Sequence, residues 1–511
     1  MGAVLAIDAG TTGVRTLAFD EAGALVGSAY RELTQHYPRP GWVEHDPQEI
    51  WSHVQATLSD VATRCERAGL AVAAVGITNQ RETLVAWNKK TGIPAGPAIV
   101  WQDRRSSAIC DRLRGAGHEP FVRERTGLVL DPYFTATKMA WWIGTGDCVP
   151  RLEVSSDLAL ATVDSWVAWN LTGGPEGGAL VTDSTNASRT LLYDIRSRGW
   201  SQDLCELFAV PMSALPTVVA SCGEVGVLRG ELGSIPALRG VPVAGIAGDQ
   251  HAALFGQACF HPGMAKVTNG TGSFILLTYG PDVPPTLDGV LSTVAWDLGE
   301  HALSGEETAR FVYALEGAVF ATGAATQWLR DGLGIIADSS EVGALAGQIA
   351  DTEGVFVVPA FTGLGSPWWD PYARGAIVGL TRGSGRAHVA RAVVESMAFQ
   401  VRDVVDAMSG SIAAQTLRVD GGASVLDLLL QLQADQIQAP VARPTNTETT
   451  AFGAAALAGL ATGVWGSLAE LSGLWQLDRE FTPQTSRAAA DSKHAGWIRA
   501  VQRSRGWAQS D

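Results

Sequence analysis

Cysteine is scarce in this chain. Only six cysteines occur among the 511 residues, they are scattered, and no two of them form a C-x-x-C pair. The histidines do not gather with them at the spacing of metal ligands. This pattern excludes a disulfide scaffold and a zinc module, and it is typical of reduced thiols in a cytoplasmic protein.

Basic residues are also in deficit. The chain has 37 lysines and arginines but 52 aspartates and glutamates, so its formal net charge is −15. Such a charge argues against nucleic acid or an anionic membrane surface as a partner. Any anionic substrate must therefore be held locally, by backbone amides and individually placed cations.

The chain lacks a convincing membrane span. The stretch Ala451–Ala469 carries no charge, but it is mostly alanine and glycine with few large apolar side chains. Its transfer into a bilayer is unfavourable, so we predict a tightly packed, buried helix. No basic segment followed by an apolar one opens the chain, so no secretory signal is expected. We expect no integral membrane association.

Two apolar strands that end in carboxylates are the main feature that is present. Residues 3–8 form the first, which ends at Asp8, passes through a Gly/Thr turn and continues as a strand at 14–19. A turn signal and a third strand at 24–27 follow. The second carboxylate, Asp249, comes directly after the apolar run 245–248.

The same pattern recurs after Asp249. Strands are predicted at 264–268 and 273–277 on either side of a glycine-rich turn, and apolar residues at spacings of three and four predict a helix at Arg386–Met408. A chain of 511 residues is too long to fold around a single hydrophobic core. We therefore predict an α/β protein with two similar halves, divided near residue 252, and a cleft between them.

The turn Gly10–Gly13 reads Gly-Thr-Thr-Gly, which lets backbone amides approach a phosphate closely. Arg15 adds a cation for the transferring group, and Asp8 is placed to hold a metal ion, through water if the ion is Mg²⁺. An ordinary hairpin turn is the alternative interpretation. The flanking Asp8 and Arg15 favour the phosphate loop.

Asp249 is interpreted as the general base, which takes the proton of an alcohol as it attacks a phosphoryl group. A cap at the end of a strand or a structural ion pair is the alternative. By sequence logic alone, Asp8 and Asp249 can exchange roles.

Several further motifs follow one another in an order typical of one family: Pro40–Pro47, Gly76–Thr83, Val100–Arg105, Thr126–Phe134, Gly248–Gln250, Tyr313–Ala318 and Pro359–Gly365. With them the chain resembles the FGGY carbohydrate kinases of the actin-like ATPase superfamily. The resemblance implies two ribonuclease H-like domains with a catalytic cleft between them: residues 1–252 with the phosphate loop and polyol-binding residues, and residues 253–511 with the nucleotide-binding site. It also favours Asp249 as the base.

A polyol pocket is the best-matched part of the resemblance. A small polyol needs donors and acceptors for adjacent hydroxyls and an apolar wall for its carbon chain. The resemblance implies seven residues for it, all present: Arg81, Glu82, Trp101, Tyr133, Asp249, Gln250 and Phe274. The alternatives are a surface ion pair for Arg81 and Glu82, and core packing for the aromatic residues.

The nucleotide site matches the family less completely. The resemblance implies contacts to the donor at Thr11, Thr12, Gly13, Arg15, Thr271, Gly272, Gly323, Gln327 and Gly422, although Gly13 and Val14 stand where Ser-Ser is usual. The chain departs from the family at Ala9, where Gln is usual, at Asn269, where Tyr is usual, and at Leu426, where Asn is usual. We therefore expect ATP to be the donor, but with weaker binding or a relaxed base preference.

The resemblance implies an enzyme that transfers phosphate from ATP, with Mg²⁺, to glycerol, giving sn-glycerol 3-phosphate and ADP. Another small acceptor (erythritol, threitol or dihydroxyacetone) is the second reading, and a non-catalytic ATP-dependent assembly protein is the third. A homo-oligomer, dimer or tetramer, is expected from the family.

Two segments bear on regulation. Residues 230–240 contain no histidine and no clustered Gly-Thr-Arg pattern, so neither sugar-bisphosphate control nor histidine phosphorylation is expected. The segment 296–311 is longer than is usual in the family, and we assign it no role.

Overall fold

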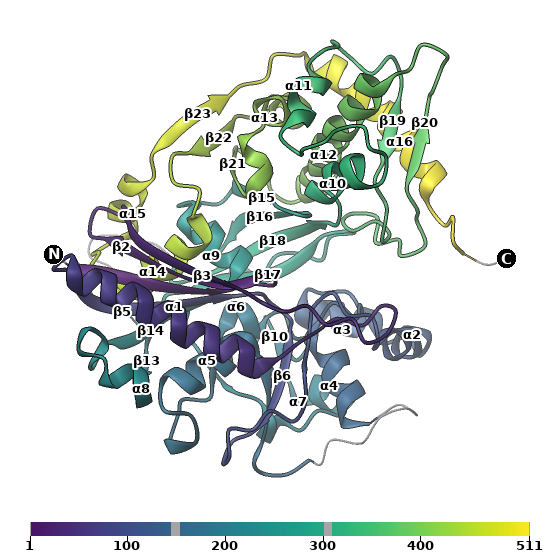
Figure 1. The fold of residues 1–511 in the computed structure, drawn as a ribbon. Coiled ribbons are helices and arrows are strands. Elements are labelled where there is room, and N and C mark those ends of the chain that lie inside the picture. Colours follow the sequence, from purple (N-terminus) through teal and green to yellow (C-terminus); the bar gives the residue numbers. More distant parts are fainter. Residues whose placement is uncertain (1, 145–153, 301–308, 510–511) are drawn as a thin grey trace.

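The computed structural model of the protein describes residues 2–144, 154–300 and 309–509. Figure 1 shows the first half of the chain (purple to blue) below and the second half (green to yellow) above. Each half is built around its own large mixed sheet.

The sheet of the first half has six strands in the order β13-β14-β5-β1-β2-β3. β1 pairs antiparallel with β2 and parallel with β5, and β5 pairs parallel with β14. The predicted strands at 3–8, 14–19 and 24–27 are confirmed as β1 to β3, with β3 longer than expected. The bounds are β1 Gly2–Ala9, β2 Gly13–Asp20, β3 Leu25–Glu32, β5 Ala71–Asn79, β13 Cys222–Val227 and β14 Pro242–Gly248.

The sheet of the second half repeats this arrangement with seven strands in the order β17-β18-β16-β15-β21-β22-β23. The β15–β16 hairpin and the parallel pairing of β15 with β21 correspond to β1–β2 and β1–β5. The predicted strands at 264–268 and 273–277 are confirmed. The bounds are β15 Met264–Asn269, β16 Ser273–Gly280, β17 Leu291–Asp297, β18 Phe311–Val319, β21 Thr416–Asp420, β22 Val441–Pro444 and β23 Leu477–Phe481.

The remaining elements connect and cover these sheets. A four-stranded sheet, β4-β7-β6-β8, belongs to the first half. The remaining helices and strands of the first half are β4 Glu44–His45, α1 Pro47–Arg67, β6 Leu84–Asn88, β7 Ala98–Ile99, α2 Ser107–Gly115, α3 Glu119–Thr126, α4 Thr135–Ile143, β8 Leu158–Thr162, α5 Val163–Leu171, β9 Val181–Asp183, α6 Ser184–Ala187, β10 Tyr193–Asp194, β11 Gly199–Trp200, α7 Gln202–Leu207, β12 Thr217–Val219 and α8 Gly230–Ser234. In the second half they are α9 Asp249–Gly256, α10 Gly323–Asp331, α11 Glu341–Ala346, β19 Phe356–Val358, β20 Ala376–Val378, α12 Arg386–Met408, α13 Asp427–Ile437, α14 Thr449–Ala461, α15 Leu468–Leu474 and α16 Arg487–Ser504.

Helix α12 has the predicted bounds, and its buried face lies in the core. The charge-free stretch 451–469 is only partly one helix. It contributes most of the buried α14, which ends at Ala461, and after a turn at Gly463, whose φ is +75°, α15 begins at Leu468. No helix in the described part of the chain has both the length and the apolar character needed to cross a membrane.

The described cysteines behave as predicted. Five of them, Cys65, Cys110, Cys205, Cys222 and Cys259, are free and buried. Cys148 and residues 301–308 of the long segment 296–311 lie outside the described residues.

Helix α14 lies between β22 and β23 of the second sheet in sequence but packs on the first sheet. It contacts β1, β5, β13 and β14. The approach is close because two strand residues are glycines. A Cβ on Gly76 would lie 2.1 Å from the carbonyl oxygen of Ala454, and one on Gly245 would lie 2.6 Å from the backbone nitrogen of Ala458. One apolar cluster therefore joins the two halves, with Val4 and Phe19 from the first and Leu276 and Leu457 from the second.

Helices α9 and α14 also touch backbone to backbone. A Cβ on Gly453 would lie 1.8 Å from the carbonyl oxygen of Ala252, and one on Gly256 would lie 2.0 Å from that of Thr449. Because α9 begins at Asp249, this contact fixes the position of the candidate base.

Replacing Gly453 by alanine tests this contact. The methyl group has no room beside the Ala252 carbonyl, so Gly453→Ala should lower the free energy of unfolding by about 3 kcal/mol, as measured by urea denaturation. Gly473→Ala is the matched control: this exposed glycine of α15 has open space around its Cβ position. Equal stability of the two variants would contradict the packing argument.

Candidate active site

Three adjacent parallel strands end at one edge of the first sheet. Asp8 of β1 stands opposite Thr78 of β5, and Gly248 of β14 stands opposite Asn79. The residues that follow these ends are the phosphate loop Gly10–Gly13, the segment 80–83 and Asp249. Because ligands of open α/β sheets bind beyond the carboxyl ends of parallel strands, this edge is the candidate active site.

Arg81 is the centre of the predicted polyol site. Its Nε lies 3.2 Å from Oδ1 of Asp249, and its two terminal nitrogens donate to the Glu316 carboxylate at 2.7 and 2.9 Å. It also reaches the hydroxyl of Tyr133 at 3.4 Å. Arg81 is 2% exposed and Glu82 1%. The alternative of a surface ion pair is therefore wrong: both charges are buried at the site.

Two residues of this cluster were not predicted. Arg189, which is fully buried, donates from Nε to Glu82 at 2.7 Å and from Nη2 to Glu316 at 3.0 Å. Burial opposes the ionisation of Glu316, but Arg189 and Arg81 outweigh it and hold the pKa of this carboxyl below its ordinary value. Glu316 lies in the quoted motif 313–318, which is a signal for it, whereas Arg189 stands in no such motif.

Asp249 keeps a partly open carboxylate, with 30% of its side chain exposed. Burial raises its pKa to about 6, Arg81 opposes that shift, and Glu82 adds to it. A carboxylate with this pKa is ionised at neutral pH and is a stronger base than an ordinary aspartate.

Gln250 is held by Lys266. The Lys266 Nζ donates to the side-chain oxygen of Gln250 and, at 2.9 Å, to the hydroxyl of Thr268. Burial lowers the pKa of Lys266 to about 8, with Asp420 and Asp249 opposing the shift. The amide of Gln250 is thus oriented by a fixed donor.

The three predicted aromatic residues lie together. The Trp101 ring meets the Tyr133 ring edge to face at 5.6 Å and the Phe274 ring at 6.3 Å, and the Arg81 guanidinium is 5.9 Å from the Phe274 ring. Tyr133 is buried, while Trp101 and Phe274 are half-buried. Core packing therefore accounts for Tyr133 more fully than for the other two, which form an accessible apolar wall beside Arg81.

The phosphate loop is held by its carbonyl groups. The carbonyl oxygen of Thr12 accepts from the backbone N–H of Leu33 at 2.9 Å and from the hydroxyl of Tyr30 at 3.1 Å. Gly13 has no space for a side chain, because a Cβ there would lie 2.3 Å from the Tyr30 ring. No described residue accepts a hydrogen bond from the amides of Thr11 and Thr12, so these two donors remain available.

Arg15 is bound to Asp8 in this structure. Its Nη2 and Nε lie 2.5 and 3.2 Å from Oδ2 of Asp8, and its Nη1 lies 2.8 Å from Oε2 of Glu448. The Asp8 interaction raises the pKa of Arg15 above its ordinary value. Asp8 Oδ1 accepts no hydrogen bond from any described residue, which leaves one oxygen for a hydrated metal ion. No group of three or more His, Cys, Asp or Glu side chains suited to a metal occurs among the described residues.

The second glycine loop, Gly270–Gly272, meets the start of α10. The amide of Gly323 donates to the carbonyl oxygen of Gly270 at 2.9 Å, and that of Ala324 donates to Thr271 at 3.0 Å. A Cβ on Gly421 would lie 2.7 Å from the carbonyl oxygen of Asn269. Three of the segments predicted to bind the nucleotide, with Thr271, Gly272, Gly323 and Gly422, therefore lie together. Gln327 is exposed one turn further along α10.

The departures from the family pattern have distinct surroundings. Asn269 is buried, its Oδ1 accepts from the Ser273 hydroxyl at 2.9 Å, and its Nδ2 has no partner among the described residues. Leu426 is half-buried against Gly343 of α11. Ala9 is buried at the end of β1.

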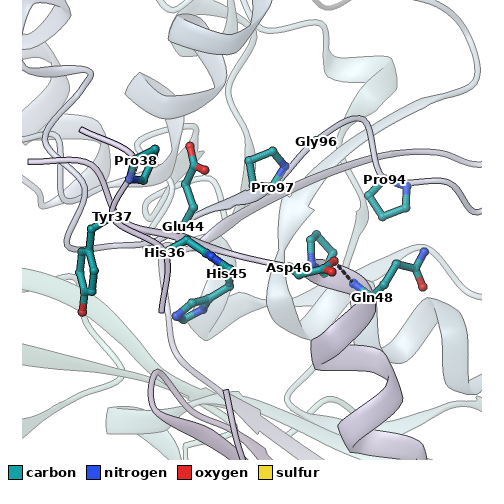
Figure 2. A pocket seen from close by; sticks show the side chains of 11 residues that line it. His36, Tyr37, Pro38, Glu44, His45, Asp46, Gln48, Pro94, Gly96 and Pro97 are labelled. Atoms are coloured by element: carbon teal, nitrogen blue, oxygen red, sulfur yellow. Dashed lines mark hydrogen bonds between the residues drawn. The ribbon is translucent and has the colours of Figure 1, made fainter. Parts of the chain in front are cut away.

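A pocket of about 630 Å³ lies apart from these residues, lined by segments 36–38, 44–48 and 94–97. Figure 2 shows that the side chains of Glu44 and His45 leave β4 in opposite directions, and that Asp46 caps α1 through the backbone N–H of Gln48. None of the residues predicted for the active site lines this pocket.

Comparison with known proteins agrees with this geometry. Residues 3–256 match the FGGY family of carbohydrate kinases, N-terminal domain, and residues 265–462 match the C-terminal domain of the same family. The two-domain fold is that of a carbohydrate kinase. The chain belongs to the FGGY family of carbohydrate kinases.

Two full-length relatives are named glycerol kinase. The chain is 49% identical over 510 residues to a glycerol kinase of Aeromonas hydrophila, covering 99% of each chain, and 50% identical over 515 residues to one of Trichlorobacter lovleyi, covering 100% of each. Among solved structures it resembles the glycerol kinase of Plasmodium falciparum with ADP, at 32% identity and a TM-score of 0.88, over 99% of this chain and 98% of that one. The predicted fold class, two actin-like ATPase domains, is confirmed.

A substitution can test whether the Glu316 carboxylate stabilises the fold by binding both Arg81 and Arg189. Glu316→Gln keeps the shape and removes the charge, which leaves two buried guanidinium groups without their shared anion. We expect a loss of about 3 kcal/mol or more in the free energy of unfolding, measured by urea denaturation. Asp60→Asn, which breaks the exposed pair with Arg31, is the control and should cost less than about 1 kcal/mol. Similar losses in both variants would argue against this account.

Proposed function

We propose that the protein phosphorylates glycerol with ATP, giving sn-glycerol 3-phosphate and ADP. The proposal rests on one observation above all: the Asp249 carboxylate, with its pKa raised to about 6, lies 3.2 Å from Arg81, and 30% of its side chain is exposed. The full-length relatives named glycerol kinase support the choice of acceptor.

In this proposal the residues of the first half hold the polyol. Arg81 donates to, and Glu82 and Asp249 accept from, adjacent hydroxyl groups, while Trp101 and Phe274 cover the carbon chain. The ionised Asp249 takes the proton of the attacking hydroxyl. Polar sites of this kind reject analogues that lack a hydroxyl, because their own buried groups then stay unpaired.

The donor is proposed to lie across the two glycine loops. The free amides of Thr11 and Thr12, with Gly13 and Arg15, would bind its phosphates, and Thr271, Gly272, Gly323, Gln327 and Gly422 would bind the nucleotide. Mg²⁺, held through Asp8 and water, would neutralise phosphate charge when bound. Arg15 must exchange its contact with Asp8 for phosphate when the donor enters.

Further parts of the proposal extend beyond the chemistry. We place the domain division near residue 252 and the protein in the cytoplasm, as a homo-oligomer, dimer or tetramer. Weaker or less selective ATP binding is expected from Asn269, Leu426 and Ala9, and a panel of nucleotide donors tests it. Tight, adenine-selective binding would contradict that expectation.

The base assignment has a direct test. Asp249→Asn keeps the side-chain shape but cannot accept the proton, so kcat should fall by about 10²–10⁴-fold. The measurement is ADP release with Mg·ATP and glycerol in a coupled assay. Asp203→Asn, at an exposed position of α7, serves as the control. Retained activity in Asp249→Asn would remove Asp249 as the base.

The acceptor is tested in the same assay by comparing glycerol with dihydroxyacetone, erythritol, threitol and a pentose. We expect the highest kcat/KM for glycerol. A higher value for a four-carbon alditol or for dihydroxyacetone would replace glycerol by that acceptor and leave the rest of the mechanism intact.

The pH dependence follows from Asp249. Because the ionised form is the base and its pKa is about 6, kcat/KM for glycerol should fall about tenfold per pH unit below pH 6 and level off above it. The profile is measured at saturating ATP. A flat profile down to pH 5 would show that this carboxyl does not control the rate.

A further inference from the structure

The outer side of the phosphate loop is held by three side chains from different segments. His45 of β4 is fully buried, and its two ring nitrogens contact Gln35 and Gln80: Nε2 lies 2.9 Å from Oε1 of Gln35, and Nδ1 lies 3.3 Å from Nε2 of Gln80. We call Gln35, His45 and Gln80 the loop clamp.

The partners determine the form of the imidazole. Oε1 of Gln35 can only accept, so Nε2 of His45 carries the proton. Nε2 of Gln80 can only donate, so Nδ1 of His45 is the acceptor. Burial lowers the pKa of His45 to about 4, with Glu49 opposing the shift and His36 adding to it. The ring is therefore neutral at physiological pH, and each nitrogen has one partner of the right kind.

Both glutamines pass this constraint to the loop. The Nε2 of Gln35 donates to the carbonyl oxygen of Thr11 at 2.8 Å, and the Nε2 of Gln80 donates to that of Gly10 at 3.1 Å. Two successive loop carbonyls are thus drawn toward the clamp. In successive peptide units, holding the carbonyl oxygens on one side directs the N–H groups to the other side.

The loop clamp also reaches the aromatic wall. The Oε1 of Gln80 accepts from the hydroxyl of Thr83 at 2.9 Å. The hydroxyl oxygen of Thr83 in turn accepts from the backbone N–H of Trp101 at 3.1 Å. The indole Nε1 of Trp101 donates to the hydroxyl of Thr11 at 2.9 Å. The phosphate loop and the wall of the polyol site therefore share one hydrogen-bonded network.

We propose that His45, through Gln35 and Gln80, is a positioning residue that holds the Thr11 and Thr12 amides toward the phosphates of the donor. It touches no substrate and acts only by orienting the loop. The inference rests on the proposed function for the identity of the donor, a nucleoside triphosphate, but not for the identity of the acceptor.

The test compares variants that differ in which of the two ring contacts they restore. His45→Phe keeps a flat ring and loses both contacts. His45→Asn places an oxygen near the Nδ1 position and restores the acceptor for Gln80, whereas His45→Gln places a nitrogen near the Nε2 position and restores the donor for Gln35. Calorimetric titration of the full chain with the non-hydrolysable analogue Mg·AMP-PNP gives Kd, and the ADP-release assay gives KM for ATP and for glycerol.

We expect His45→Phe to raise Kd for Mg·AMP-PNP and KM for ATP about tenfold, while KM for glycerol stays within about twofold. The Asn and Gln variants should each recover part of the loss. His36→Phe is the matched control, because His36 is exposed beside His45 and outside the clamp, and it should bind like the wild type. If His45→Phe does not fold, Gln35→Met, which removes the amide that links His45 to the Thr11 carbonyl, should show the same selective loss.

Three results would overturn the proposal: His45→Phe binding the analogue like the wild type, equal losses in the Phe, Asn and Gln variants, or parallel increases in the constants for nucleotide and glycerol. A wild-type chain that does not phosphorylate glycerol would refute the proposed acceptor instead. The nucleotide titrations would still decide the role of His45.

Discussion

The ionic bond of Glu316 across the two halves is the interaction on which the site depends. This fully buried carboxylate comes from the second sheet and binds the guanidinium groups of Arg81 and Arg189 from the first half. A buried ion pair of this kind is stable only while all its partners are present. Arg81 in turn lies beside Asp249. The site thus holds two fixed guanidinium groups, paired with the carboxylates of Glu82, Glu316 and Asp249, in a chain whose net charge is −15.

Much of the fold could be predicted from sequence, because its elements are signalled locally. The strands around Asp8 and the repeat after Asp249 have clear apolar runs and turns, and helix α12 has a regular apolar period. The charge-free stretch was harder to predict. Its composition indicates burial but contains no marker for the break after Ala461 other than Gly463, and glycine is frequent throughout that stretch.

The site was predictable where the residues stand at strand ends and less so where they meet only in space. Asp8 and Asp249 follow apolar strands, and so do Arg81 and Glu82. Arg189, by contrast, reaches the cluster through contacts more than a hundred residues apart in sequence, and no local pattern announces such a contact. The burial of Arg81 and Glu82 was likewise hidden from local reasoning, because adjacent opposite charges are typical of surfaces as well as of active sites.

Helix α14 gives the chain a particular kind of connectivity. It lies between β22 and β23 of the second sheet in sequence, yet it covers the apolar face of β1, β5 and β14 and meets α9 at Gly453. A fragment that stopped near residue 252 would leave that face bare to water. The first half is therefore a unit of sequence but not an autonomous folding unit, and its final stability must await the synthesis of residues 449–461 on the ribosome.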